Sequence, residues 1–237
     1  MVRPTTRATP RRWTDDQNLL VYRLVSALTS LLLRVWVRYF RAVGAENLPS
    51  TGGAFLVANH TSGLDPFLLG VSVPQRVMTG PGKVELFKNP LVAWVMRRIG
   101  IFPLQQGVAD TGAVRTMIAR FRQGDIVIVY PEGGRSRTGS LQPFNPDFTR
   151  LVLKLRAPVI PAGIAGARDV LPVGELIPHR NTAVAVVIGS MLDLAPFEGR
   201  TLDAATLQEA TAVLEAAVSG CLDEADKVRQ ELAPPQR

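Results

Sequence analysis

The chain has 237 residues with 27 basic and 20 acidic side chains, which gives a formal net charge of +7. That length suits one α/β domain with a sizeable core, and a hydrophobic content of 46% excludes a disordered or collagen-like chain. A single cysteine excludes an intrachain disulfide framework, and two histidines argue against a polyhistidine metal site. We therefore expect no resident metal ion.

The positive charge is unevenly distributed along the chain. Residues 1–41 hold eight arginines and two aspartates, whereas residues 42–237 carry a net charge of only +1. A protein body that binds nucleic acid spreads its basic residues over a groove or a face. We therefore expect no nucleic-acid partner and assign the excess charge to the N-terminal segment.

Residues 1–43 are predicted to form a basic tail followed by a helix from about Gln17 to Val43. The longest uncharged run, Leu24–Leu33, is shorter than the roughly 18 apolar residues that a spanning helix needs. At 100° per residue, a sector of about 80° beside a wide apolar face contains five arginines: Arg12, Arg23, Arg34, Arg38 and Arg41. This pattern favours an amphipathic helix that lies on a membrane surface; the alternative is a helix packed on the domain.

After Gly44, short apolar runs alternate with longer helical stretches. The predicted strands are 54–58, 77–79, 101–104, 125–130, 159–164 and 182–188. The predicted helices are 66–73, 90–99, 112–123 and 202–232. The alternation predicts an α/β fold over residues 44–237, with a mainly parallel sheet flanked by helices.

The segment after the first predicted strand, residues 59–66 (NHTSGLDP), contains a histidine and a carboxylate five positions apart. His60 and Asp65 do not share a face of a regular helix, but the turn-forming residues between them permit contact. A carboxylate beside a histidine fixes the tautomer and raises the basicity of the ring, as a general base requires. Alternatively, Asp65 only caps a helix that begins at Pro66.

A second polar segment, residues 130–139 (YPEGGRSRTG), follows the most apolar predicted strand. Its glycines let a backbone approach a ligand closely, and Arg135 and Arg137 offer forked donors for phosphate. Glu132 could accept from a hydroxyl or pair with an arginine, and the alternative is an ordinary polar loop. Because both segments follow apolar strands, a parallel sheet would bring them to the same edge.

Lys83 lies in a turn rich in Gly and Pro, where it is either a phosphate contact or a solvated lysine. Common signatures of other chemistry do not occur: the sequence has no Gly-x-Ser-x-Gly elbow, no Walker loop and no Gly-x-Gly-x-x-Gly after a strand. Cys221 falls on the apolar face of the last predicted helix, which favours packing over nucleophilic chemistry.

In order and spacing, these segments resemble the blocks of the glycerolipid acyltransferase family, which includes the 1-acylglycerol-3-phosphate acyltransferases. The Asn-His-x4-Asp block matches at Asn59, His60 and Asp65. The Glu-Gly-x-Arg-Ser block matches at Glu132, Gly133, Arg135 and Ser136. Weaker matches to the other blocks lie at 83–87, 100–103 and 159–161.

The resemblance implies that His60 takes the proton of an acceptor hydroxyl while Asp65 holds the imidazole. The hydroxyl oxygen would attack the thioester of acyl-CoA or acyl-carrier protein, with no cofactor beyond that co-substrate. The resemblance implies binding roles for Asn59, Lys83, Glu132, Gly133, Arg135 and Ser136. The acceptor would be a lysophospholipid, foremost 1-acylglycerol-3-phosphate giving phosphatidic acid, at the cytoplasmic face of the cell membrane.

Two departures from the family pattern concern the acceptor. Gln105 and Gln106 stand where family members commonly carry a phosphate-binding arginine, and Gly134 replaces a frequent threonine. Loss of that charge weakens bidentate phosphate recognition. Another lysolipid acceptor, a membrane-surface binding module without chemistry, and a hydrolase that uses water as acceptor are therefore kept as alternatives.

Overall fold

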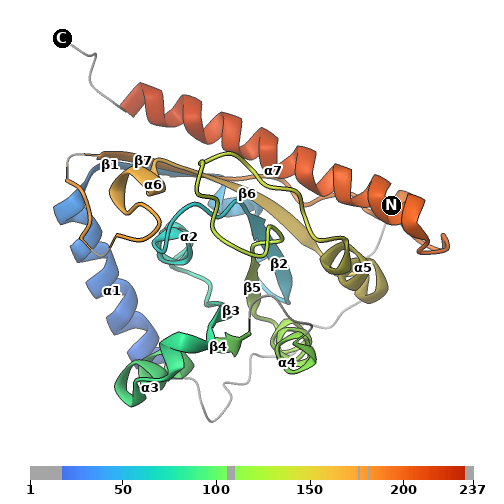
Figure 1. The fold of residues 1–237 in the computed structure, drawn as a ribbon, viewed down its shortest axis with the longest axis horizontal. Helices are drawn as coiled ribbons and strands as arrows, with labels where there is room; N and C mark the ends of the chain where they lie inside the picture. The colour runs from blue at the N-terminus through green and yellow to red at the C-terminus, as the bar shows by residue number, and fades with distance from the viewer. Residues whose placement is uncertain (1–17, 106–109, 176, 181, 233–237) are drawn as a thin grey trace.

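A computed structural model describes residues 18–105, 110–175, 177–180 and 182–232. Seven strands form one sheet in the order β1-β7-β6-β2-β5-β3-β4 (Figure 1). The strands are β1 (Val37–Val43), β2 (Ala54–Ala58), β3 (Met78–Lys83), β4 (Ile101–Leu104), β5 (Ile126–Val129), β6 (Val159–Ala165) and β7 (Thr182–Ile188). Among them, only β6 and β7 pair antiparallel, so the predicted α/β fold with a mainly parallel sheet is confirmed.

Helices cover both faces of the sheet, as its apolar pattern requires. The α-helices are α1 (Leu19–Trp36), α2 (Asp65–Ser72), α3 (Pro90–Arg98), α4 (Thr111–Arg122), α5 (Pro146–Leu155), α6 (Ala167–Val170) and α7 (Ala204–Leu232), with short 3-10 turns at 45–47, 84–87 and 195–197. Along β2, Leu56 packs toward α1, α2 and α6, whereas Phe55 and Val57 pack toward α4, α5 and α7. The central strands are buried on both sides, which explains their uninterrupted apolar sequences.

The predicted helix from Gln17 to Val43 is wrong over its last seven residues. Helix α1 ends at Trp36, and Val37–Val43 form β1, which pairs in parallel with β7 at the edge of the sheet. Val and aromatic residues suit this pairing, which outweighs the helical periodicity of the segment. The sheet thus includes seven residues that the sequence assigned to the N-terminal segment 1–43.

The predicted stripe of five arginines is consequently divided. Arg23 and Arg34 remain on α1, and both are exposed. Arg38 and Arg41 belong to β1, where Arg41 lies 3.5 Å from Glu231 of α7. Arg12 lies outside the described residues. A regular stripe over the whole segment therefore does not form, and the exposed surface of α1 is mostly leucine.

Helix α1 is more apolar as a unit than its longest uncharged run suggests. Its 18 residues have a mean hydropathy of 1.5, and by length and composition alone the helix could cross a membrane. Its inner side packs against α2 and α3, and Leu33 belongs to the core. The outer side leaves Leu20, Leu24 and Leu28 more than half exposed.

Helix α5 is absent from the elements expected from the sequence. The Asn145 side chain caps it by accepting from the Asp147 N–H at 2.9 Å, and Pro146 occupies its first position. Phe148 and Val152 then recur at helical spacing and are buried. The sequence therefore contains a recognisable helix start at this point. The polar loop before it makes that signal easy to miss.

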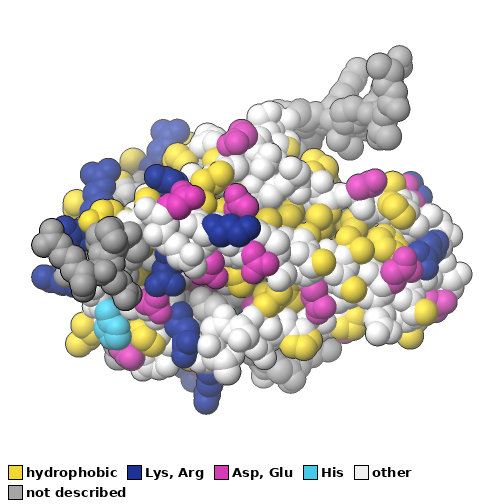
Figure 2. Space-filling view, turned by 90° about the horizontal axis from the view of Figure 1, so that it is seen from above, with side chains coloured by type: hydrophobic (Ala, Val, Ile, Leu, Met, Phe, Trp, Pro, Cys, Tyr) yellow, Lys and Arg dark blue, Asp and Glu magenta, His cyan; other side chains and the backbone are white. Residues whose placement is uncertain are grey.

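Helix α7 lies across one face of the sheet, along β6 and β7 (Figure 1). It approaches so closely because Gly163 of β6 has no side chain: a Cβ there would overlap the backbone of Cys221 and Leu222. Helix α7 carries six acidic and two basic side chains, and side chains of both signs are visible on the face shown in Figure 2.

Replacing Gly163 by alanine is expected to destabilise the fold by about 2 kcal/mol, because α7 must move away from β6. The matched control is Gly220→Ala on α7, where a Cβ meets open space; removing a helical glycine there should stabilise by up to about 1 kcal/mol. Urea unfolding of both variants checks the pair. Equal stability of the two would contradict the close packing of α7 on β6.

Candidate active site

Two loops meet at the carboxyl edge of the sheet, one after β2 and one after β5. These strands are parallel neighbours in register, with Val57 opposite Val129. The backbone N–H of His60 donates to Oε1 of Glu132 at 2.6 Å, and the Ser136 N–H donates to the His60 carbonyl at 2.7 Å. The expectation that these segments converge is confirmed.

Asp65 holds the imidazole of His60 at its Nδ1 edge. Its Oδ2 lies 2.8 Å from Nδ1 of His60 and accepts the N–H groups of Thr61 at 2.7 Å and Ser62 at 2.8 Å. The carboxylate is fully buried, so these contacts are shielded from water. An Nδ1–H that donates to a carboxylate leaves the lone pair on Nε2, which makes Nε2 of His60 available as a base.

Asp65 occupies the first turn of α2 itself, whereas the sequence placed it as the cap before a helix starting at Pro66. Its contacts show why it is more than a cap. All three donors to Oδ2 come from the loop before the helix, and Oδ1 is buried with no hydrogen-bond partner among the described residues. The carboxylate therefore serves the loop and the histidine, not the helix end.

The ring of Tyr130 supports His60 on its face. The two rings stack with centroids 4.0 Å apart and an angle of 12° between their planes. Burial raises the pKa of the Tyr130 phenol well above its usual value, so the ring is neutral, and its hydroxyl makes no hydrogen bond among the described residues. Sequence reasoning does not assign Tyr130 a role, because its stacking on His60 depends on the register of β2 and β5.

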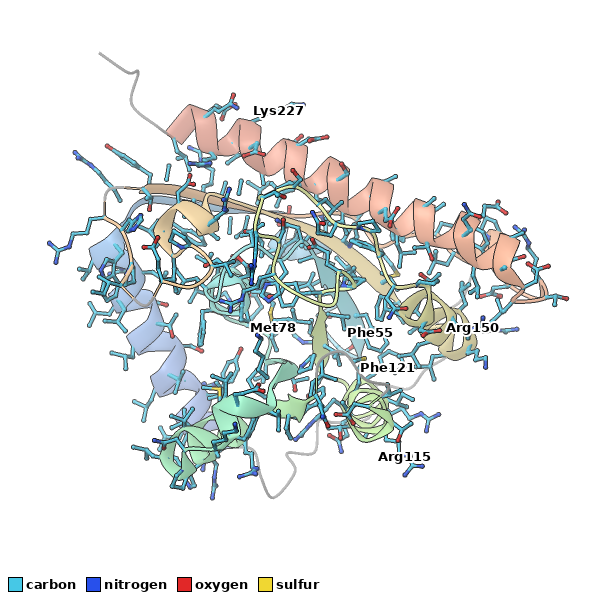
Figure 3. The ribbon with its side chains drawn as sticks, viewed as in Figure 1. Phe55, Met78, Arg115, Phe121, Arg150 and Lys227 are labelled. Carbon is cyan, nitrogen blue, oxygen red and sulfur yellow. The ribbon has the colours of Figure 1, made fainter. Side chains whose placement is uncertain are left out.

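An apolar cavity of about 160 Å³ reaches Tyr130, one of the two stacked residues. Its walls come from α1, α2, α3, β3 and the end of β5, and include Val25, Phe67, Met78, Ile128 and Tyr130. Met78 is marked in Figure 3, below the centre of the sheet. The inner side of α1 is thus one wall of a cavity that ends at Tyr130, the residue whose ring stacks on His60.

Glu132 joins the two loops rather than standing free. Its Oε1 accepts from the His60 N–H at 2.6 Å, and its Oε2 accepts from the Gln142 N–H at 2.9 Å. Burial raises the pKa of Glu132 above its usual value, while these two N–H donors act in the opposite direction. Each oxygen retains a lone pair, but the carboxylate already has a structural role.

Two residues expected to bind substrate are instead built into the scaffold. The Asn59 side chain is buried and uses both polar atoms on Ile164 of β6, donating at 3.0 Å and accepting at 2.8 Å. Ser136 is also buried, and its hydroxyl accepts from the Gly139 N–H at 3.1 Å. Their geometry supports positioning of the loops and leaves direct substrate contact unsupported.

Of the three remaining predicted residues, Lys83 and Gly133 are exposed and Arg135 is half-buried. A Cβ added at Gly63 would lie 3.5 Å from Nη1 of Arg135, so that guanidinium lies over the loop of the histidine. Lys83 is exposed at the carboxyl end of β3, and Gly133 has a φ of 73° in an exposed turn that excludes most other residues. Neither Arg135 nor Lys83 has an ion-pair partner among the described residues.

The position of the missing family arginine is open to solvent. Gln105 is exposed directly after β4, and its N–H donates to Oδ2 of Asp110 at 3.0 Å. Gln106 lies outside the described residues. Within the part of the chain that the structure describes, no group of three or more His, Cys, Asp or Glu side chains could hold a metal ion.

Comparison with known proteins agrees with this geometry. Residues 40–165, more than half of the chain, match the model of the family described as Acyltransferase. The crystal structure of the 1-acyl-sn-glycerophosphate acyltransferase PlsC of Thermotoga maritima superposes with a TM-score of 0.66 at 26% identity, covering 84% of this chain and 78% of that one.

Two relatives name different acceptors. A chloroplastic 1-acyl-sn-glycerol-3-phosphate acyltransferase of Brassica napus is 29% identical over 66% of this chain, and the match spans only 47% of that protein's length. A lyso-ornithine lipid O-acyltransferase of Pseudomonas aeruginosa is also 29% identical, over 92% of this chain and 82% of that protein. With the histidine–aspartate pair, the sheet edge and the family match in place, the chain belongs to the acyltransferase family.

Proposed function

We propose that the chain transfers a fatty acyl group from a thioester, acyl-CoA or acyl-carrier protein, to the hydroxyl of a lysolipid. The observation that carries this proposal is the hydrogen bond of 2.8 Å between Nδ1 of His60 and the buried Asp65. It leaves Nε2 as the base, on a ring that stacks against Tyr130 at the end of an apolar cavity. No resident cofactor takes part, because the thioester supplies the activated acyl group.

The reaction needs two proton transfers, and one histidine performs both. Nε2 of His60 takes the acceptor's hydroxyl proton while the oxygen forms a bond to the thioester carbon. The resulting tetrahedral oxyanion collapses, the carbon–sulfur bond breaks, and the imidazolium returns the proton to the departing thiolate. Asp65 stabilises the transient imidazolium. Because the acceptor oxygen attacks the thioester directly, the reaction requires no acyl-enzyme and no serine nucleophile.

The apolar cavity is the proposed place for an acyl chain. It ends at Tyr130, whose ring contacts the imidazole, so a chain lying in it would present its reacting carbon near His60. Apolar walls favour a hydrocarbon chain and exclude a competing water molecule. This exclusion supports transfer to a hydroxyl over hydrolysis.

Arg135 and Lys83 are the proposed contacts of an acceptor phosphate, and 1-acylglycerol-3-phosphate is the first acceptor proposed. Lys83 is exposed at the carboxyl end of β3, and the half-buried Arg135 lies in the loop that follows β5. A guanidinium offers paired donors to phosphate, and a lysine adds a mobile charge. The product would then be phosphatidic acid.

A second candidate acceptor is a lysolipid without a phosphate monoester. Two observations favour it: Gln105 stands at the position of the family arginine, and the relative named for a lyso-ornithine lipid matches the larger share of this chain. An uncharged amide suits a neutral or zwitterionic headgroup better than a dianion. Both candidates share the same transfer chemistry.

The membrane surface is the proposed partner of α1. Its outer side exposes leucines at positions 20, 24, 28, 31 and 32, flanked by Arg23 and Arg34. The neighbouring α3 adds Leu91 and Trp94, which are 71% and 48% exposed. Apolar side chains bordered by arginines suit the boundary between headgroups and acyl chains. We place the chain on the cytoplasmic face of the cell membrane, as a monotopic protein.

His60→Ala should lower kcat for thiol release from acyl-CoA by about 10²-fold to 10⁴-fold, because the base is lost. The matched control is His179→Ala, since the His179 side chain is exposed and, among the described residues, pairs with Glu175. Stopped assays with labelled acyl-CoA and a panel of lysolipids measure both. Near-normal turnover of His60→Ala would exclude the proposed mechanism, and no transfer by the wild-type chain would favour a binding module without chemistry.

Gln105→Arg is expected to raise kcat/KM for 1-acylglycerol-3-phosphate about tenfold relative to an uncharged monoacylglycerol, because the guanidinium binds phosphate in a fork. Gln208→Arg adds the same charge on exposed α7 and should change neither value. If the wild-type chain already prefers a lysolipid without a phosphate monoester, the second candidate acceptor replaces the first.

Charged substitutions on the outer side of α1 should release the chain from membranes. Leu24→Glu combined with Leu28→Glu is expected to reduce binding to vesicles of anionic phospholipid at least tenfold, because both leucines are more than half exposed. Val213→Glu on α7 is the control and should bind as the wild type does. Vesicle sedimentation measures the difference; equal binding of all three would place the contact elsewhere.

A further inference from the structure

A hollow of about 360 Å³ lies beside the histidine loop and is lined by two arginines from different segments. Arg137 comes from the loop after β5, and Arg168 comes from α6, after β6. Pro172, Val173 and Gly174 form the rest of its lining. None of these five residues is acidic, so the hollow holds two positive charges and no negative one.

Nearby carboxylates are engaged elsewhere and leave these charges uncompensated. Asp169 pairs with Arg229, and Glu175 pairs with His179. Arg137 makes no hydrogen bond or ion pair among the described residues. Arg168 makes one hydrogen bond, from Nη1 to the Thr138 carbonyl at 2.9 Å.

That one contact fixes the Arg168 side chain against the loop that carries Arg137. Gly139, next to Thr138, has a φ of 90°, which favours glycine, and a Cβ there would lie 3.1 Å from Nη1 of Arg168. The guanidinium is thereby oriented, and its other N–H groups have no partner within the described part of the chain. Two oriented like charges without a counter-ion repel each other, and an anion between them would remove that cost.

The hollow is coupled to the histidine loop through Leu171, the residue before its lining segment. The Ser62 hydroxyl donates to the Leu171 carbonyl at 2.8 Å, and a Cβ at Gly63 would lie 3.9 Å from Leu171 Cδ2 and 3.5 Å from Arg135 Nη1. Ser136, between the two arginines of its loop, donates to His60. Hydrogen bonds therefore join the segments on both sides of the hollow to the histidine loop.

We propose that Arg137 and Arg168 form a phosphate-binding subsite, separate from the Arg135 and Lys83 contacts and built partly from α6. The inference rests on the proposed function, because the phosphate belongs to one of its two substrates. Its source is either the acceptor headgroup or the phosphate groups of the thioester donor. The recognition chemistry is the same in both cases: forked donors on phosphate oxygens.

Phosphate binding without turnover tests the subsite directly. In an Arg135→Gln background, which removes the neighbouring contact, the affinity for inorganic phosphate is measured by ³¹P NMR titration. Adding Arg168→Gln, or separately Arg137→Gln, should weaken that affinity at least tenfold through loss of a charge-assisted pair. Adding Arg115→Gln, on exposed α4 and far from α6 (Figure 3), should leave it unchanged. Unchanged affinity in both subsite variants overturns the proposal.

Steady-state kinetics of the single Arg168→Gln variant identify the source. A tenfold rise in KM for acyl-CoA assigns the subsite to the donor, and the same rise in KM for a phosphate-bearing acceptor assigns it to the acceptor. Both KM values unchanged would exclude the subsite from the reaction. If the wild-type chain transfers no acyl group but Arg168→Gln still loses phosphate affinity, the proposed function fails while the subsite stands.

Discussion

The buried carboxylate of Asp65 is the constraint on which the site depends. One of its oxygens receives three donors from the preceding loop: the imidazole of His60 and the N–H groups of Thr61 and Ser62. Burying a charge is costly unless it is hydrogen-bonded, and these contacts offset that cost. The same three bonds fix the path of the loop, so the orientation of the imidazole and the shape of the loop are set together.

Around this pair, several motif residues hold the protein together instead of pointing at a substrate. Asn59 joins the end of β2 to β6 through two hydrogen bonds to Ile164. Glu132 joins the loop after β5 to His60 through its carboxylate. The ring of Tyr130 stacks on the imidazole of His60. A conservative change at any of these positions therefore alters where the base lies, even though none of them need touch the reacting atoms.

The sequence predicts the central strands well because they are buried on both faces and read as continuous apolar runs, as at 54–58. It also predicts that His60 and the loop of Glu132 meet, since parallel neighbours end at one edge. It fails at β1, where pairing with β7 decides the structure and local periodicity does not. The sequence also does not predict that Arg168 lies near Arg137, because the packing of α6 brings the two together.

The junction between α1 and β1 has no intervening loop: Trp36 ends the helix and Val37 begins the strand. A helix attached through a flexible linker can settle at any angle, whereas this one turns and tilts with the edge of the sheet as a single body. Along β1, the parallel ladder to β7 runs from Val37 to Val43 with an irregularity between Val37 and Tyr39, and α1 also packs on α2 and α3. The direction in which α1 presents its leucines is therefore tied to the same sheet that carries the histidine loop.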